Sequence, residues 1–186
     1  ARLSVARTLG RCATDMTSIV KQTPGRGFEP NLRDYATAAS GFSWAAARAE
    51  LEGLPGGGLN IAHEAVDRHV RGALASAVAL RCLGRASAGS VQRDVTYREL
   101  AALSNRFANV LRALDVRKGD AVFALSPRVP ELFVAALGTW KALGVFCPLF
   151  SAFGPEPIKT RMSLGKARVL LTTAALYARK VAPLRA

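Results

Sequence analysis

The stretch "VFCPLFSAFGPEPIKTRM" (residues 145–162) combines residue types that could bind a ligand. An apolar run leads into a loop that contains Phe150, Ser151 and Ala152, and a basic segment that begins with Pro155 follows. Small side chains let a ligand approach the backbone, and the free amide hydrogens at the start of a helix attract anions. The alternative interpretation is an ordinary corner between a strand and a helix, and the local residues leave both open.

Other residue types that could do chemistry lack the required spacing. His63 and His69 would sit about 240° apart around a helix, so they could not hold one metal ion on a single face. The cysteines, Cys12, Cys82 and Cys147, are far apart and odd in number, which favours a reducing compartment without a disulfide framework. We therefore predict no metal ligands, and interpret the histidines as surface or packing residues and the cysteines as small apolar side chains.

The positive charge of the chain is large. Its 186 residues include 26 Lys and Arg against 13 Asp and Glu, which gives a net charge of +13. Such a surface can attract nucleic acid or anionic lipid, a phosphorylated small molecule, or an acidic partner surface. The aromatic motifs of RNA-binding folds and a helix-turn-helix pattern are absent, so we expect no nucleic acid partner. The nucleic-acid alternative predicts salt-dependent retention on DNA.

Residues 131–154 form the most apolar part of the sequence. A membrane span here would place Lys141 near its centre, which costs roughly 2.5–3.5 kcal/mol on insertion scales. Gly144 and Pro148 would also interrupt the helix. A buried helix followed by a buried strand fits better, so we expect no membrane association and a cytoplasmic protein.

The elements that would position the loop alternate along the second half of the chain. Thr96 and Glu99 have the spacing of a capping box, and the apolar stripe that follows, from Leu100 to Leu114, predicts a helix. After it we expect strands at 121–125, 145–149 and 167–173, with helices at 130–144, 155–165 and from 174 onward. This alternation predicts an α/β fold, with a mainly parallel sheet and flanking helices. The loops at 126–128, 150–154 and 172–173 would then share one rim, the carboxyl edge where such sheets bind ligands.

The part before Thr96 is less regular. Residues 16–58 predict an irregular segment with one short helix, within 42–54, that ends at Gly53. Asn60 caps a predicted amphipathic helix that ends at Gly72. Its proposed apolar stripe consists of Ile61, Ala65, Val66, His69 and Val70. Two short strands, at 78–83 and 90–96, follow it and are joined by a polar turn.

Residues 1–15 are rich in Arg and contain no acidic residue before Asp15. This composition loosely resembles an organelle transit peptide. Since Met16 begins a stretch that reads like a natural start, we interpret residues 1–15 as an upstream or non-native extension.

The sequence resembles the start of an acetyl-CoA synthetase (acetate–CoA ligase, AMP-forming) of the adenylate-forming superfamily. The resemblance covers about residues 28 to 185. It is carried by "GGLNIAHEAVDRHV", "VTYRELAALSNRFANVLRALDVRKGDAVFAL", "RVPELFVAALGTWKALGVFCPLFSAFGPEPIKTRM" and "ARVLLTT". It implies that residues 59–186 form part of the N-terminal AMP-binding domain. It also implies that CoA, acetate and ATP with Mg are substrates of the full-length enzyme, which makes an acyl-adenylate and transfers the acyl group to CoA.

The working parts of that family have no counterpart in this sequence. No phosphate loop like "TSGTTGKPK" occurs before Ala186, and the family's magnesium Glu, ribose Asp and catalytic Lys are also not found. We therefore expect an N-terminal fragment with no catalytic residues, which is inactive alone and binds neither CoA nor ATP tightly. Its uncovered apolar sheet face would favour self-association. The alternative is a non-catalytic module, derived from the same subdomain, that binds CoA or a partner.

The resemblance implies one binding site in this chain. Phe150, Ser151 and Ala152 would lie near the pantetheine and nucleotide of CoA, and Arg179 and Lys180 would meet its phosphates. Arg pairs with phosphate through a planar fork, and Lys does so as a point charge. The family often has Gly-Gly where this chain has Ser151-Ala152, and the alternative for Arg179 is a solvated helix face. The loop is then both a corner of the fold and one wall of a coenzyme site.

Overall fold

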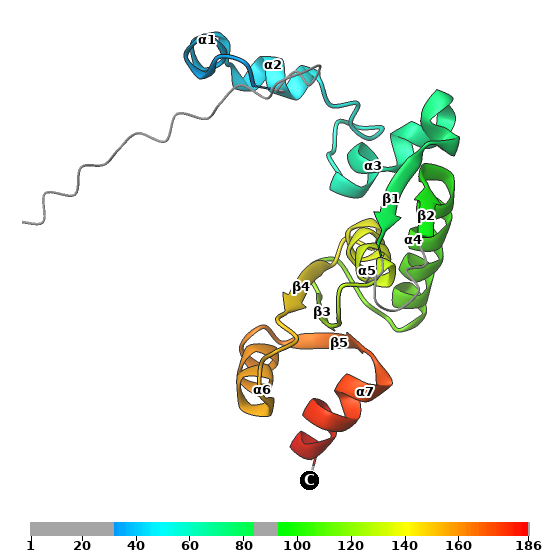
Figure 1. Cartoon of the computed structure of the whole chain (residues 1–186), viewed down its shortest axis with the longest axis vertical. Coiled ribbons are helices and arrows are strands. Elements are labelled where there is room, and N and C mark those ends of the chain that lie inside the picture. The colour runs from blue at the N-terminus through cyan, green and yellow to red at the C-terminus, as the bar shows by residue number, and fades with distance from the viewer. Residues whose placement is uncertain (1–31, 84–92, 186) are drawn as a thin grey trace, which may run out of the picture. The chain divides into compact units, whose positions relative to one another are not determined.

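The computed structural model describes residues 32–83 and 93–185. The chain divides into two compact units, Ala1–Trp44 and Ala45–Ala186 (Figure 1). The predictions for residues 1–15, for the polar turn at 84–89 and for the first positions of the strand at 90–96 lie outside the described residues.

The described part of the first unit contains a helix that the sequence did not lead us to expect. This helix, α1 (Tyr35–Gly41), is capped by Asp34, whose carboxylate accepts hydrogen bonds from the hydroxyl of Thr37 and from the amide of Ala36. These bonds lower the pKa of the Asp34 carboxyl. The short helix predicted within 42–54 is present as α2 (Trp44–Ala49) and ends earlier than expected.

The continuous helix predicted from Asn60 to Gly72 is wrong. Asn60 does act as the cap, because its Oδ1 accepts a hydrogen bond from the amide of Ala62 (2.9 Å). However, α3 (Ile61–Ala65) ends at Val66, whose φ of −134° leaves the helical region. The chain continues in two 3₁₀ turns, η1 (Asp67–Arg71) and η2 (Ala73–Ser76).

The predicted apolar stripe of this helix is also wrong at its start. Ile61 is 57% exposed, whereas Ala62 and Val66 are buried. The amide of the Asn60 side chain donates a hydrogen bond to the carbonyl of Trp140 (2.8 Å). This bond fixes the rotation of α3 against its neighbour, so a different face is turned inward from the one that hydropathy suggests.

The two short strands before Thr96 form an antiparallel pair. β1 (Val78–Cys82) pairs with β2 (Arg93–Thr96), and Arg81 makes a two-pronged ion pair with Asp94 across them, with both N–O distances 2.8 Å. Helix α4 (Tyr97–Ala113) follows directly, and the predicted capping box at its start is confirmed.

The parallel sheet predicted from the alternation is confirmed. β3 (Ala121–Leu125) lies in the centre, between β4 (Val145–Leu149) and β5 (Ala167–Thr172). The connecting helices are α5 (Pro130–Lys141) and α6 (Pro155–Leu164). After β5 the chain forms a short helix, α7 (Ala174–Leu176), then a wider turn, η4 (Tyr177–Val181), and a final 3₁₀ turn, η5 (Ala182–Arg185).

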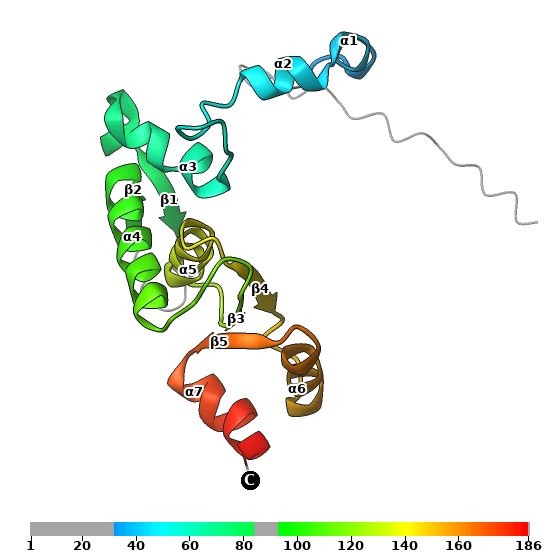
Figure 2. The same cartoon turned by 180° about the vertical axis from the view of Figure 1, so that it is seen from behind.

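Helices lie against both faces of this sheet, whereas we expected one apolar face to be uncovered. Figures 1 and 2 show α4 and α5 on one side of β3, and α6 and α7 on the other. Val122 packs with Leu111 of α4, whereas Phe123 and Leu125 pack with Ile158 of α6 and Leu176 of α7. Alternate side chains of one strand therefore serve two separate parts of the core.

Lys141, the one charge that follows Glu131 in the apolar stretch 131–154, is held inside the fold by a polar cluster. Its side chain is only 9% exposed, and its ammonium lies 2.6 Å from Oδ1 of Asp67 and 2.8 Å from Oδ1 of Asn105. A buried cation is tolerated when it is paired and hydrogen-bonded in this way. Among residues 32–83 and 93–185, no helix has the length and apolar content that crossing a membrane requires.

Gly138 allows α4 and α5 to pack closely. A Cβ atom at this position would lie 2.8 Å from the carbonyl oxygen of Ser104 and 2.8 Å from Cδ1 of Phe107. We expect Gly138→Ala to lower the free energy of unfolding by about 1–3 kcal/mol, because backbone cannot move aside as a flexible side chain can. Urea unfolding measures this change. Gly72→Ala is the matched control, since a Cβ there meets nothing within 4 Å. A Gly138→Ala chain as stable as the wild type would contradict this packing.

The capping box makes stability depend on pH. Hydrogen bonds from the amide and the hydroxyl of Thr96 lower the pKa of Glu99 from its ordinary value of 4.5. Because the folded pKa is depressed, this contribution is present above pH 4.5 and is lost as pH falls through the folded value. Urea unfolding from about pH 7 to about pH 3 should therefore show the wild type losing its advantage over Glu99→Gln at the acid end. An advantage that stays constant with pH would contradict the assignment.

Candidate functional site

The three parallel strands end at one edge of the sheet. Leu125, the last residue of β3, lies opposite Leu149 of β4 and Thr172 of β5. The loops at 126–128, 150–154 and 172–173 therefore leave the sheet together, as predicted. This is the carboxyl edge, where open α/β sheets bind their ligands.

The loop after β4 forms a tight turn. The amide of Phe153 donates a hydrogen bond to the carbonyl of Phe150 (3.0 Å), and the two rings meet edge to face with centroids 5.7 Å apart. The guanidinium of Arg161 lies 4.2 Å from the centre of the Phe153 ring, which is within the range of a cation–π contact. Phe150 is 64% exposed, Ala152 is exposed and Ser151 is half-buried, so the outer side of the turn is accessible.

The turn after α7 brings Lys180 onto this loop. Its ammonium donates hydrogen bonds to the carbonyls of Ser151 (2.5 Å) and Phe153 (2.7 Å). The structure thus brings Phe150, Ser151, Ala152 and Lys180 together, while their role in binding CoA stays a prediction. The partners of Lys180 were not foreseen, because nothing in the sequence ties a lysine to carbonyls nearly thirty positions earlier.

Arg179 differs from its neighbour. It is exposed, and its side chain makes no hydrogen bond or ion pair with any residue in 32–83 or 93–185. Adjacent residues of a helical turn do not face each other, so Arg179 and Lys180 leave η4 in different directions. The start of this segment is fixed by Thr173, whose Oγ1 accepts a hydrogen bond from the amide of Leu176 (3.3 Å). Arg179 is therefore available to an external anion.

The histidines pack within the fold, as expected. His63 is 8% exposed, and its Nε2 lies 3.3 Å from Oε1 of Glu52. The ring of His69 meets the ring of Tyr97 edge to face, with centroids 5.1 Å apart. Burial disfavours the charged form of the nearby Glu64 carboxyl and by itself would raise its pKa. Hydrogen bonds from the amide of Gly53 and from Arg68 outweigh this effect and leave the pKa below its ordinary value.

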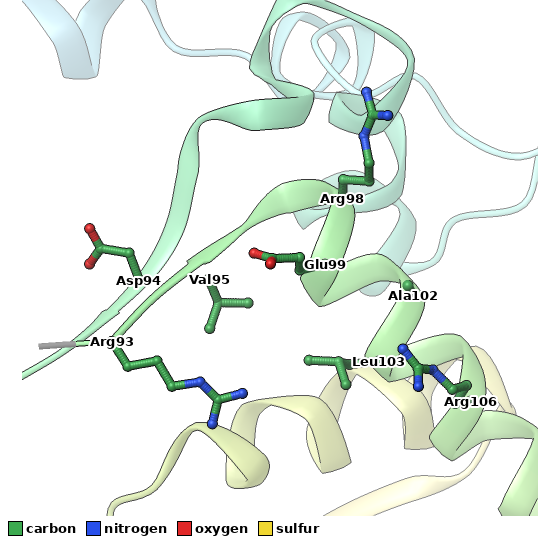
Figure 3. Close-up of a pocket in the computed structure, with 8 residues that line it drawn as sticks. All are labelled: Arg93, Asp94, Val95, Arg98, Glu99, Ala102, Leu103 and Arg106. Carbon is green, nitrogen blue, oxygen red and sulfur yellow. The ribbon is translucent and has the colours of Figure 1, made fainter. Parts of the chain in front are cut away.

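A separate cavity of about 340 Å³ lies between β2 and the first turns of α4 (Figure 3). Arg93, Arg98 and Arg106 contribute its positive charge. Arg93 lies 3.4 Å from Oε1 of Glu131, and Figure 3 shows Arg98 extending away from the other lining side chains. Glu99, also on its wall, is engaged in the capping box. Two of its charged groups, Arg93 and Glu99, are thus engaged with other residues and Arg98 extends away, so the rim beside Lys180 is the stronger candidate.

The fold defines an α/β protein with a parallel sheet and a candidate ligand rim at its carboxyl edge. Residues 68–186 match the family model of the AMP-binding enzymes, so the chain belongs to the AMP-binding enzyme family. The resemblance to adenylate-forming acyl-CoA synthetases, and the α/β fold that it implies, are confirmed.

Curated relatives and solved structures agree with this assignment. The chain is 36% identical over 163 residues to the acetyl-coenzyme A synthetase of Bacillus subtilis (strain 168), covering 86% of this chain and 27% of that protein. It is 37% identical over 117 residues to the acetyl-coenzyme A synthetase of Syntrophus aciditrophicus (strain SB), covering 63% and 18%. The crystal structure of Brucella canis acyl-CoA synthetase matches with a TM-score of 0.70 and 34% identity, covering 78% of this chain and 26% of that one. The chain therefore spans 27% or less of each of these relatives.

Proposed function

We propose that this chain is the N-terminal part of an acetyl-CoA synthetase, which joins acetate and ATP to acetyl-AMP and then transfers the acetyl group to CoA. The observation that carries the proposal is the meeting of the loop at 150–154 with Lys180 at the carboxyl edge of the sheet. The similarity to curated acetyl-coenzyme A synthetases supports acetate as the acid.

In this proposal the chain supplies one wall of the CoA site. Ser151 and Ala152 have small side chains, so the thin pantetheine arm can run close to the backbone of the turn. The exposed ring of Phe150 offers an apolar surface beside it. Arg179 pairs with a phosphate of the coenzyme through parallel N–H bonds, which are stronger than neutral hydrogen bonds.

The remaining steps are proposed to depend on parts of the enzyme outside this chain. Its 186 residues contain no Ser/Thr/Gly-rich phosphate loop of the "TSGTTGKPK" kind, so ATP with Mg and acetate are handled elsewhere. Residues 59–186 act as part of the N-terminal domain, and no catalytic residue is assigned within them. The free thiols of Cys82 and Cys147 accord with a cytoplasmic location.

The isolated chain is proposed to self-associate. Val145 on the edge strand β4 is 50% exposed, and Leu143 and Phe133 are exposed to a similar extent. Unpaired edge strands and exposed apolar side chains both favour contact between copies of a chain.

An activity assay tests the proposal that ATP and acetate are bound by parts of the enzyme outside this chain. The 186-residue chain incubated with ATP, acetate and CoA should release no AMP above background. A chimera, in which this chain replaces the matching segment of the Bacillus subtilis acetyl-coenzyme A synthetase, should release AMP when acetate is present. AMP formation by the isolated chain, or an inactive chimera that retains a cooperative unfolding transition, would contradict the proposal.

The CoA site is tested by a charge substitution. Arg179→Gln should weaken CoA binding by about tenfold, because a hydrogen bond between charged groups is lost without disturbing the fold. Titration followed by NMR suits the weak affinity expected of the chain. Arg168→Gln is the control: it removes the same charge at the opposite end of β5, where Arg168 lies 3.6 Å from Asp115. Equal effects of the two substitutions would show that only the net charge matters.

A further inference from the structure

The carbonyls that Lys180 contacts come from both sides of Ala152. An ammonium group has three hydrogens to donate. Two of them are directed at the backbone oxygens of Ser151 and Phe153, at 2.5 Å and 2.7 Å. Short bonds of this kind between a charged donor and carbonyls are stronger than neutral ones. The peptide groups that follow Ser151 and Phe153 are therefore both held by a single side chain.

The same loop is anchored a second time through its aromatic ring. Phe153 is half-buried and packs against the core cluster that includes Ile158 and Leu176. Its ring also lies beneath the guanidinium of Arg161. The ring fixes the C-terminal end of the turn, but it leaves the orientation of the preceding peptide groups open. The hydrogen bond from the amide of Phe153 to the carbonyl of Phe150 closes the turn, and the bonds from Lys180 hold the carbonyls of Ser151 and Phe153.

We propose that Lys180 is a positioning residue: it holds the backbone of residues 151–153 in place, while Arg179 receives the anion. The identity of the anion rests on the proposed function. The contact by which Lys180 holds the loop does not depend on that function. This division of roles revises the expectation that both basic residues meet phosphate. The ammonium of Lys180 is half-buried and directed at the loop, whereas Arg179 is exposed and without a partner among the described residues.

Pre-ordering the loop has a direct consequence for binding. A turn that is ordered before the ligand arrives does not lose conformational freedom on binding, so the affinity is higher than for a loose turn. With the carbonyls drawn toward Lys180, the opposite side of the turn is left to the ligand. Lys180 thereby acts on the ligand through the backbone of Ser151 and Ala152, without touching it.

Hydrogen–deuterium exchange of the intact chain, without ligand, tests the hold. Lys180→Met removes the donors and keeps the length of the side chain. We expect amides of residues 151–154 to exchange about tenfold faster, while those of β3 are unchanged. Lys180→Arg should restore much of the protection, because a guanidinium can also donate to two carbonyls. Lys118→Met is the control, since it removes the same charge from an exposed turn. Unchanged exchange in the loop, or faster exchange throughout the unit, would overturn the proposal.

The salt dependence of CoA binding separates the two basic residues. Screening weakens a direct contact between charges, so Arg179→Gln should reduce the fall in affinity between about 0.05 and 0.3 M salt. Lys180→Met should weaken CoA binding several-fold. Its affinity should nevertheless fall with salt as steeply as that of the control Lys118→Met, which has lost the same charge. If the salt dependence of Lys180→Met is reduced as much as that of Arg179→Gln, Lys180 is itself a phosphate ligand. If no variant and no wild-type chain binds CoA, the proposed function fails, while the exchange result still decides the role of Lys180.

Discussion

The burial of strand β3 is the constraint on which the larger unit depends. All five of its residues are buried, and it pairs with a parallel strand on each side. Val122 faces α4 while Phe123 and Leu125 face α6 and α7, so one short strand forms the centre of two helix-covered layers. The approach is close on the second face, where a Cβ on Gly165 would lie 2.6 Å from the ring of Phe123. Because Leu125 lies opposite Leu149 and Thr172 at the ends of the strands, the same pairing also brings their three following loops to one edge.

Local signals in the sequence were sufficient to predict this sheet. "AVFAL" is apolar at every position, as a strand covered on both faces must be, and the capping box of Thr96 and Glu99 is confirmed by reciprocal hydrogen bonds. The failures lie where a distant contact overrides local pattern. The bond from Asn60 to Trp140 joins residues 80 positions apart, and it accompanies a break at Val66 that helical periodicity does not reveal. The site shows the same limit: its basic residues could be read from the sequence, but the carbonyl partners of Lys180 could not.

The excess of positive charge is also distributed in a way that composition does not reveal. Several cations are used within the fold: Lys141 pairs with Asp67, Arg81 with Asp94, and Arg68 with Glu64. The more exposed pair of Arg81 with Asp94 contributes little stability, but each of the three pairs removes charge from the surface that a ligand meets. Arg179 has no such partner among the described residues, and it stands next to Lys180, whose ammonium contacts the loop at 150–154. A net charge of +13 is therefore weaker support for an anion site than the position of this one side chain.

The loop at the carboxyl edge of the sheet is attached to the hydrophobic core at both of its ends. Leu149, buried at the end of β4, fixes where the loop begins, and Ile158, fully buried in α6, fixes where it ends. Phe153 and Leu176 belong to the same cluster as Phe123, so the loop and the segment that carries Lys180 are both attached to β3. With its two ends held by the core and its carbonyls held by Lys180, the turn has little freedom left to lose. Its shape is set by folding before any ligand arrives, which is the condition under which small side chains such as Ser151 and Ala152 can serve as a binding surface.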